Sequence, residues 1–327
     1  MILPMPDLTL GIVAVAGEAI VDLVPAPIGD YLEKAPGGSP ANVAVGLARL
    51  GVPTRMLARL ATDPFGRLLH DHLARNGVDL DHAVTALEPS SLAIVSVGPD
   101  GGAQYDFRVA GTADWQWTPG ELSAALDGPV VAVHSGSLAL TTAPGAGVLR
   151  DLLRAARDTA TVTYDPNVRP LLMGERTEVL AGVEELLTVA DVVKVSSEDL
   201  DWLLPGTTPD QLVKDWLARG PSLVVVTLGG EGVLAGTASG IRRRRPAHLV
   251  DVIDTVGAGD TFMAALLGGL HHHNLLGAAQ RPALGAPSAD TLDSILDDAL
   301  LAAAINCGRR GADPPTAGEL AAARQSP

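Results

Sequence analysis

The sequence VVAVHSG at residues 130–136 is an apolar run of strand length, and it opens the alternation that decides the fold. Helical patterns and further strands follow it in turn, at 145–160, 161–167, 176–190, 191–197, 208–220 and 222–230. Strands that alternate with helices of this length predict an α/β fold with a doubly wound, mostly parallel central sheet flanked by helices. In such sheets ligands bind beyond the carboxyl ends of the strands, so residues at those ends are the first candidates for a site.

Two segments interrupt this alternation. Residues 19–36 follow the first strand without a clear helical pattern, and residues 91–111 contain two strands around a Pro-Asp-Gly-Gly turn. We expect one domain over residues 1–327, with a small β-sheet lid formed by about 19–36 and 91–117. Because the exposed edges of such strands are commonly protected by pairing with another chain, we also expect a homodimer through the lid.

Composition excludes several classes of protein. The formal net charge of −15 repels nucleic-acid phosphates and anionic membranes. The apolar runs are too short or too interrupted to span a bilayer, and the apolar N-terminal stretch lacks the basic region of a signal peptide. The single cysteine, Cys307, excludes an internal disulfide and a cysteine metal cluster. These features predict a cytoplasmic protein with a small-molecule ligand.

Several familiar motifs are absent. There is no Walker A loop, and the first strand is followed by AGEAIVD, whose single glycine does not make the G-x-G-x-x-G turn of a dinucleotide-dependent oxidoreductase. Three consecutive histidines at 271–273 point in different directions on a helix, so we interpret them as a polar helix end and not as a metal site.

The stretch DTVGAGDTF at 254–262 is followed directly by the apolar run MAALLGGL. Glycines allow close approach of the backbone to a ligand, and the first N–H groups of a helix have no intrahelical partner. A turn of this kind before a helix predicts a cradle for an anion such as a phosphate. Asp260 would lie beside that cradle and accept a proton from an attacking hydroxyl; the alternative is that it only caps the helix.

A second glycine cluster, PGGSPANVAVGLARLG at 36–51, is a turn followed by an amphipathic helix. Asn42 lies in the first turn of that helix, and Asp22 follows the first strand at its carboxyl end. Both side chains suit the hydroxyls of a sugar, because they offer acceptors and donors at fixed geometry. The alternatives are a helix cap for Asn42 and a turn residue for Asp22.

These two stretches resemble the two signatures of the ribokinase-like (PfkB) carbohydrate kinases. The resemblance covers nearly the whole chain, because further pieces fit in order: GEAIVDLVP, YDPNVRP, VKVSSEDL, VVTLGGEG and GADPPT. The pieces GEAIVDLVP, GGSPANVA, GTADWQW and YDPNVRP are most similar to the fructokinase branch.

The resemblance implies ATP-dependent phosphorylation of a sugar hydroxyl, most simply that of fructose, with magnesium. Asp260 matches the catalytic base, and the N–H groups of Gly257, Ala258 and Gly259 match the anion hole for the transferring phosphoryl group. The positions that match sugar-binding residues are Asp22, Gly38, Asn42, Asn167 and Arg169, with Arg108 of the lid added. The positions that match ATP-binding residues are Lys194, Ser196, Thr227, Gly229, Gly232 and Asn306.

The metal positions are the least regular part of the resemblance. Many relatives have N-x-x-E where this chain has Ser-Ser-Glu-Asp at 196–199. By register Asp199 matches the glutamate that organises magnesium through water, and Glu198 is its rival. A potassium site behind the anion hole is also implied, from Asp254 and the carbonyl groups of Val256, Asn306, Arg309 and Gly311.

Other interpretations stay open at this point. A 2-keto-3-deoxygluconate kinase would need arginines in the pocket, which Arg108 and Arg169 supply. A nucleoside kinase would need an aromatic slot, for which Trp115 and Trp117 are candidates, and a ribokinase is a third possibility. A non-catalytic sugar- or nucleotide-binding regulator is disfavoured, because the base and the anion hole are both intact.

Overall fold

The computed structural model describes residues 11–26, 28, 31–97 and 103–325. Its main sheet is built from β1 (Ile12–Ala16), β4 (Thr54–Leu57), β9 (Val130–Gly136), β10 (Thr161–Asp165), β11 (Val192–Ser196), β12 (Leu223–Thr227), β13 (Val233–Thr237) and β14 (Arg242–Arg245). These eight strands lie in the order β14-β13-β12-β11-β10-β9-β1-β4. The strands from β4 to β12 pair in parallel, while β13 and β14 are antiparallel additions at one edge.

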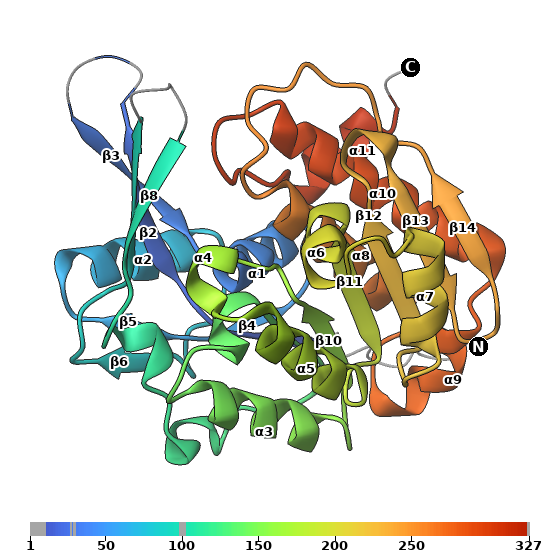
Figure 1. Cartoon of the computed structure of the whole chain (residues 1–327), viewed down its shortest axis with the longest axis horizontal. Helices are drawn as coiled ribbons and strands as arrows, with labels where there is room; N and C mark the ends of the chain where they lie inside the picture. The colour runs from blue at the N-terminus through green and yellow to red at the C-terminus, as the bar shows by residue number, and fades with distance from the viewer. Residues whose placement is uncertain (1–10, 27, 29–30, 98–102, 326–327) are drawn as a thin grey trace, which may run out of the picture.

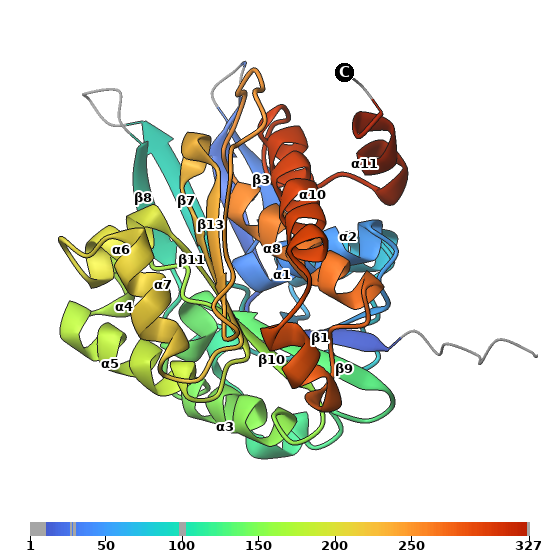
Figure 2. The ribbon, with the colours of Figure 1, turned by 90° about the vertical axis from the view of Figure 1, so that its right-hand side faces the viewer.

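Helices cover both faces of this sheet (Figures 1 and 2). One face packs against α1 (Ser39–Arg49), α2 (Pro64–Arg75), α8 (Ala258–His272) and α10 (Ala289–Cys307). The other packs against α3 (Ala146–Ala156), α5 (Arg176–Leu187), α6 (Ser197–Leu203) and α7 (Pro209–Leu217). Successive residues of a strand point to opposite faces, so Val225 enters the first core while Val224 and Val226 enter the second. The predicted doubly wound α/β fold is confirmed.

A second sheet projects from one side of the main body (Figure 1). Its strands are β2 (Ile20–Pro25), β3 (Leu32–Gly37), β7 (Leu92–Val97) and β8 (Ala103–Arg108), in the order β3-β2-β7-β8. The small sheet that the two interrupting segments predicted is therefore present. The predicted turn at 99–102 lies outside the described residues.

The residues after β8 differ from the prediction. Residues 111–117 were expected to extend the lid, with Trp115 and Trp117 as candidates for an aromatic slot. They form instead a 3₁₀ turn, η1 (Ala113–Trp115), and both tryptophans are buried in the core that contains α3. The Gly145 N–H donates to the Trp115 carbonyl at 2.8 Å, which fixes this segment against the start of α3. Two large apolar side chains gain more from full burial than from a half-covered sheet.

The short elements complete the chain. They are β5 (Arg59–Ala61), β6 (Val84–Ala86), α4 (Pro170–Met173), α9 (Arg281–Gly285), α11 (Ala317–Ala323), η2 (Pro119–Leu122), η3 (Ser137–Leu140), η4 (Gly229–Glu231) and η5 (Ala278–Gln280). The basic run of the sequence is the edge strand β14, where Arg243 and Arg245 pair with Asp293 and Asp297 of α10. Within the part of the chain that the structure describes, no helix has both the length and the apolar character needed to cross a membrane.

Candidate active site

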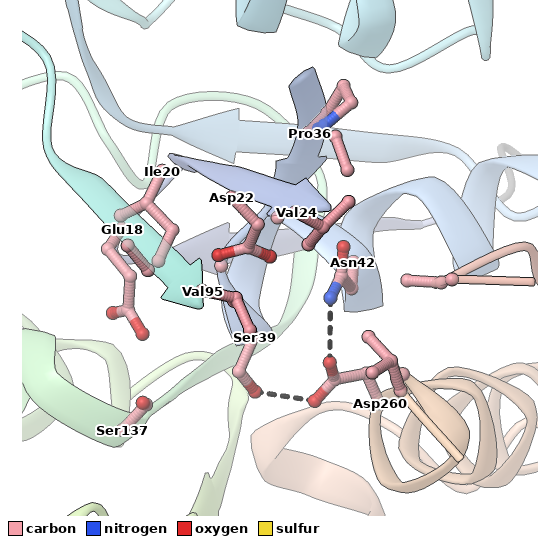
Figure 3. A pocket seen from close by; sticks show the side chains of 18 of the residues that line it. Glu18, Ile20, Asp22, Val24, Pro36, Ser39, Asn42, Val95, Ser137 and Asp260 are labelled. Carbon is pink, nitrogen blue, oxygen red and sulfur yellow. Dashed lines mark hydrogen bonds between the residues drawn. The ribbon is translucent and has the colours of Figure 1, made fainter. Parts of the chain in front are cut away.

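A cavity of about 930 Å³ lies between the second sheet and the carboxyl ends of the main sheet. The second sheet lines it with apolar side chains, among them Ile20, Val24 and Phe107, and with charged residues of β2 and β3, among them Asp22. The ends of the main strands and the first turns of α1 and α8 line it with polar groups (Figure 3). The cavity is therefore where the topology of a doubly wound sheet places a ligand.

The turn before α8 forms one wall of this cavity. Gly257 is the N-cap residue and has φ 75°, a left-handed conformation that glycine adopts without cost. The cavity is lined by Gly257, Gly259 and Asp260, whereas Ala258 is absent from its wall and donates its N–H to the Thr255 carbonyl at 3.2 Å. The N–H groups of Gly257 and Gly259 are thus the members of the predicted anion hole that border the cavity.

Two side chains hold the shape of this turn. The Asp254 carboxylate accepts the Val256 N–H at 3.0 Å and the Gly311 N–H at 2.8 Å. Asn306 is fully buried and donates its side-chain amide to the Val256 carbonyl at 2.8 Å. Its Oδ1 accepts from Thr261 and from the Asp313 N–H. The Asn306 side chain is therefore committed to the turn, in contrast to the nucleotide contact expected from the sequence.

Asp260 is held from both sides by the first turn of α1. Its Oδ1 accepts the Ser39 hydroxyl at 2.7 Å, and its Oδ2 accepts the Asn42 amide at 2.9 Å (Figure 3). The α1 helix can begin here because Gly38, its N-cap residue, has φ 99° and Pro40 occupies the first turn. Asn42 thus orients the candidate base, and the sequence analysis missed Ser39, whose only signal was its place one turn before Asn42.

A buried ion pair lies beneath the turn. Lys194 of β11 and Asp165 of β10 are both buried, with Nζ and Oδ2 2.9 Å apart. Burial alone would lower the pKa of Lys194, but the carboxylates of Asp165, Asp199 and Asp260 raise it. A Cβ built on Gly259 would lie 3.0 Å from Lys194 Nζ. Lys194 therefore supports the turn from within the protein, at a position that the resemblance matched to ATP binding.

Five of the six predicted sugar-binding residues line the cavity: Asp22, Gly38, Asn42, Asn167 and Arg169. Burial raises the pKa of Asp22 to about 6; the charge of Arg169 opposes this rise and that of Asp260 adds to it. Asn167 has φ 39°, and its buried Nδ2 has no hydrogen-bond partner among the described residues. Such an orphan donor is expected where a ligand completes the site.

Arg108 lies elsewhere. The β8 neighbour Phe107 lines the cavity, so strand alternation turns Arg108 to the opposite face, where it is exposed and pairs with Asp106 at 2.6 Å. The cavity has instead an arginine that the sequence analysis did not select. Arg310 lines it and pairs with Glu33 of β3 at 3.0 Å.

The residues predicted to organise magnesium through water make other contacts in the structure. Asp199 is buried, and its two carboxylate oxygens accept the Val168 and Ser196 N–H groups at 2.8 and 3.3 Å. Ser196 is the N-cap of α6 and accepts the Asp199 N–H, while Glu198 is exposed. No group of three or more possible metal-binding side chains was found within the described residues.

The other predicted nucleotide and potassium positions lie around the same edge of the sheet. Thr227 ends β12, and the turn after it contains Gly229 and Gly232 with φ 55° and 101°. None of these three lines the cavity. Arg309 is occupied by ion pairs with Asp313 and Glu319.

Residues 12–317 match the pfkB family carbohydrate kinases. The chain belongs to this family. It is 35% identical over 267 residues to a fructokinase of Rhizobium leguminosarum bv. trifolii, a match that covers 80% of each protein. The resemblance found in the sequence is therefore confirmed, and the protein is a carbohydrate kinase, a phosphotransferase that acts on a sugar hydroxyl.

Solved structures agree with the fold. A fructokinase from Xylella fastidiosa with bound ATP superposes with a TM-score of 0.86 at 29% identity, covering 96% of this chain and 98% of that one. A double-mutant fructokinase from Vibrio cholerae O395, in a fructose, ADP and potassium ion bound form, gives a TM-score of 0.81 at 28% identity with the same coverage.

Proposed function

We propose that this kinase is a fructokinase, which transfers the γ-phosphoryl group of ATP to a hydroxyl of fructose. The observation that carries the proposal is the placement of Asp260. Its carboxylate is fixed by Ser39 and Asn42, beside the N–H groups of Gly257 and Gly259, in a cavity that also contains Asp22 and Asn167. The curated fructokinase relative and the two fructokinase structures support the choice of sugar.

The geometry suits phosphoryl transfer. The Asp260 carboxylate would accept the hydroxyl proton as the bond to phosphorus forms, because a sugar hydroxyl is too weak an acid to ionise first. The N–H groups of Gly257 and Gly259 would stabilise the negative charge that collects on the transferring group. Positioning and charge stabilisation are most of what this reaction requires from a protein.

ATP and cations are proposed on the same basis. Thr227 ends β12, and the turn after it contains the exposed Gly229 and the buried Gly232; we assign the nucleotide phosphates and ribose to this turn. Since Asp199 is committed to backbone N–H groups, magnesium would arrive with the ATP phosphates and keep most of its water, as this ion commonly does. The Vibrio cholerae structure with a bound potassium ion supports a monovalent cation, and we assign this ion to the turn braced by Asp254.

One alternative substrate keeps specific support. Arg169 and Arg310 both line the cavity, so the carboxylate of a sugar acid such as 2-keto-3-deoxygluconate would find positive charge there. The nucleoside alternative loses its aromatic slot, because Trp115 and Trp117 are buried in the core.

The test is an ADP-release assay with ATP, magnesium and potassium. The panel is fructose, ribose, 2-keto-3-deoxygluconate, adenosine and glucose, with the Asp260→Asn variant as the blank. We expect kcat/KM for fructose to exceed the others by at least about tenfold. A larger value for another sugar would keep the mechanism and reject fructose, and silence across the panel would reject the kinase proposal for these substrates.

Asp22 gives a pH prediction. Burial raises its pKa to about 6, so the carboxylate that accepts a sugar hydroxyl is present above that pH and is lost as pH falls through it. We expect sugar affinity, measured by calorimetry without ATP, to weaken as pH falls from about 7.5 to about 5.5, a window that brackets this pKa. The Asp22→Asn variant should bind more weakly at the upper end of the window and should lack this inflection. An unchanged profile in the variant would assign the titration to another group.

A homodimer through the second sheet is also proposed. Ile28, Tyr31 and Leu32 are exposed between or within its strands β2 and β3, with 85%, 61% and 45% of their surface accessible. Apolar side chains gathered at a strand edge favour pairing with a second copy. Light scattering at micromolar concentration should give a dimer mass, and a monomer mass would contradict the proposal.

A further inference from the structure

The cavity has a second polar end that the transfer step at Asp260 does not use. Glu18, which follows β1, lines the cavity and is only 2% exposed. Its Oε2 accepts the Ala139 N–H at 3.2 Å. In Figure 3 Glu18 and Ser137 lie together at one side of the cavity, and Asp22 lies between them and Asp260.

Ser137 is held in an unusual backbone conformation. Three non-glycine residues of the described part have a positive φ, and two of them, Ser137 at 56° and Asn167 at 39°, line the cavity. Serine has no intrinsic preference for the left-handed region, so this conformation costs free energy that the surroundings must offset. Strain of this kind is concentrated at functional sites, where it fixes the direction of a side chain.

The chain path explains why Ser137 is fixed there. Gly136 ends β9 against the end of β10, so closely that a Cβ on it would lie 2.1 Å from the Asp165 carbonyl oxygen. The chain then turns directly into η3, whose Ala139 N–H is bonded to Glu18. Glu18 and Ser137 are therefore positioned by two adjacent strands of the main sheet, β1 and β9, and not by the second sheet.

Glu18 offers both a donor and an acceptor near neutral pH. Burial raises its pKa to about 7; the nearby Ser137 side chain and the Ala139 N–H oppose this rise, and the Asp114 carboxylate adds to it. Asp114, itself buried, accepts the N–H of the next residue, Ala19. The other charged groups that line the cavity are Asp22, Glu33, Lys34, Arg169, Asp254, Asp260 and Arg310. A carboxyl group that is part-protonated can both donate to and accept from the hydroxyls of a sugar.

We infer that Glu18 and Ser137 bind the sugar hydroxyls farthest from the one that is phosphorylated, and that this pair determines which sugar is accepted. The inference rests on the proposed function, because it needs a sugar in the cavity. It follows from two independent features: the shared position of the two side chains in the cavity wall (Figure 3), and the strained backbone that fixes Ser137. A buried pair of this kind penalises any sugar that leaves it without a partner.

Two substitutions remove the pair with little change in shape. Glu18→Gln keeps the side-chain length and an oxygen that can accept the Ala139 N–H. Unlike a carboxyl group, the amide does not titrate, so its nitrogen only donates and its oxygen only accepts. Ser137→Gly removes the hydroxyl and also relieves the positive φ. Glu175→Gln is the matched control, because Glu175 is exposed and its side chain caps nothing at the start of α5.

The experiment compares fructose with psicose, tagatose and sorbose, each of which differs from fructose in the configuration at one carbon. If the wild-type enzyme prefers another sugar of the first panel, that sugar and its epimers take their place. For both cavity variants we expect KM and the calorimetric Kd for the preferred sugar to rise about tenfold, with kcat changed less than about threefold. The ratio of kcat/KM for the preferred sugar to kcat/KM for at least one epimer should fall about tenfold in both cavity variants. The Glu175→Gln control should match the wild type.

The possible results separate the two proposals. Wild-type activity with unchanged discrimination in both variants would overturn this inference and leave the proposed function standing. An equal loss of kcat/KM for every sugar, together with a lower Tm in Glu18→Gln, would also overturn this inference. That pattern is expected if Glu18 only stabilises the fold by accepting the Ala139 N–H. A wild-type protein that phosphorylates no sugar would overturn the proposed function itself.

Discussion

Replacing Asp260 with asparagine is expected to lower kcat by about two to four orders of magnitude. The variant loses the group that would accept the hydroxyl proton, while its amide has nearly the same volume as the carboxylate. Ser39 and Asn42 can still form hydrogen bonds to the new amide. The Ser39 hydroxyl can accept as well as donate, and the Asn42 amide can rotate to present its oxygen. We therefore expect a Tm close to that of the wild type.

The control for Asp260→Asn is Asp251→Asn. Asp251 is an exposed carboxylate in the segment before the same turn, and it does not line the cavity. Removing its charge tests whether a general loss of negative charge near α8 affects turnover. Initial rates and thermal unfolding are measured for both variants. Near wild-type turnover in Asp260→Asn would reject Asp260 as the base, and a comparable loss in Asp251→Asn would point to long-range electrostatics instead.

The sequence predicted the main sheet well because each strand and helix carries its own pattern. The predicted strand at 130–136 coincides with β9, and the predicted helix at 176–190 contains α5. Parallel strands that are buried on both faces are near-continuous apolar runs, so the local pattern is sufficient to find them. The glycine turn was also local, since Gly257 and Gly259 lie at the start of the helix they open.

Contacts between segments that are distant in the sequence could not be predicted from local patterns. Asn42 and Asp260 each have a local signal, but they are 218 positions apart and their hydrogen bond depends on how α1 and α8 pack. Ser39 was missed for that reason. Arg108 was misplaced because one residue of strand register decides which face a side chain occupies. The carboxylate of Asp199 was selected from a motif, and only the structure reveals that backbone N–H groups already occupy it.

Glu18 and Ser137 show a further limit. The sequence around each is ordinary, because a positive φ at serine has no signature in composition or spacing. Their relation arises from β1 and β9 being neighbours in the sheet, which the order of strands along the chain does not fix. The second polar end of the cavity could therefore only be recognised in three dimensions.

Replacing Gly257 with alanine is expected to remove most of the turnover. We expect kcat to fall at least about a hundredfold, the scale of losing one anion-hole donor. A Cβ at this position would lie 2.5 Å from the Ala312 Cβ and 2.8 Å from its Cα, and the backbone is at φ 75°. Because Ala312 belongs to the segment that also contains Gly311, the turn would have to move and its N–H groups would leave their present directions.

Gly240→Ala is the matched control for that experiment. Gly240 has φ 93° and lies in the turn between β13 and β14, where a Cβ added to it would meet no heavy atom within 4 Å. This variant carries the cost of a left-handed alanine, about 1 kcal/mol of unfolding free energy, without a steric clash. Its kcat should equal that of the wild type. Denaturant unfolding and initial rates on both variants separate backbone strain from displacement of the anion hole.

Sugar binding decides how the result at Gly257 is interpreted. Asp22, Asn167 and Glu18 lie on other elements, so calorimetric affinity for the sugar should change little in Gly257→Ala even though turnover collapses. That pattern means that the turn acts on the transferring group and not on the acceptor. If affinity and turnover fall together, the turn also shapes the sugar site. If Gly257→Ala loses stability but keeps kcat within about threefold, its N–H groups are not the anion hole, since displacing a working donor costs far more.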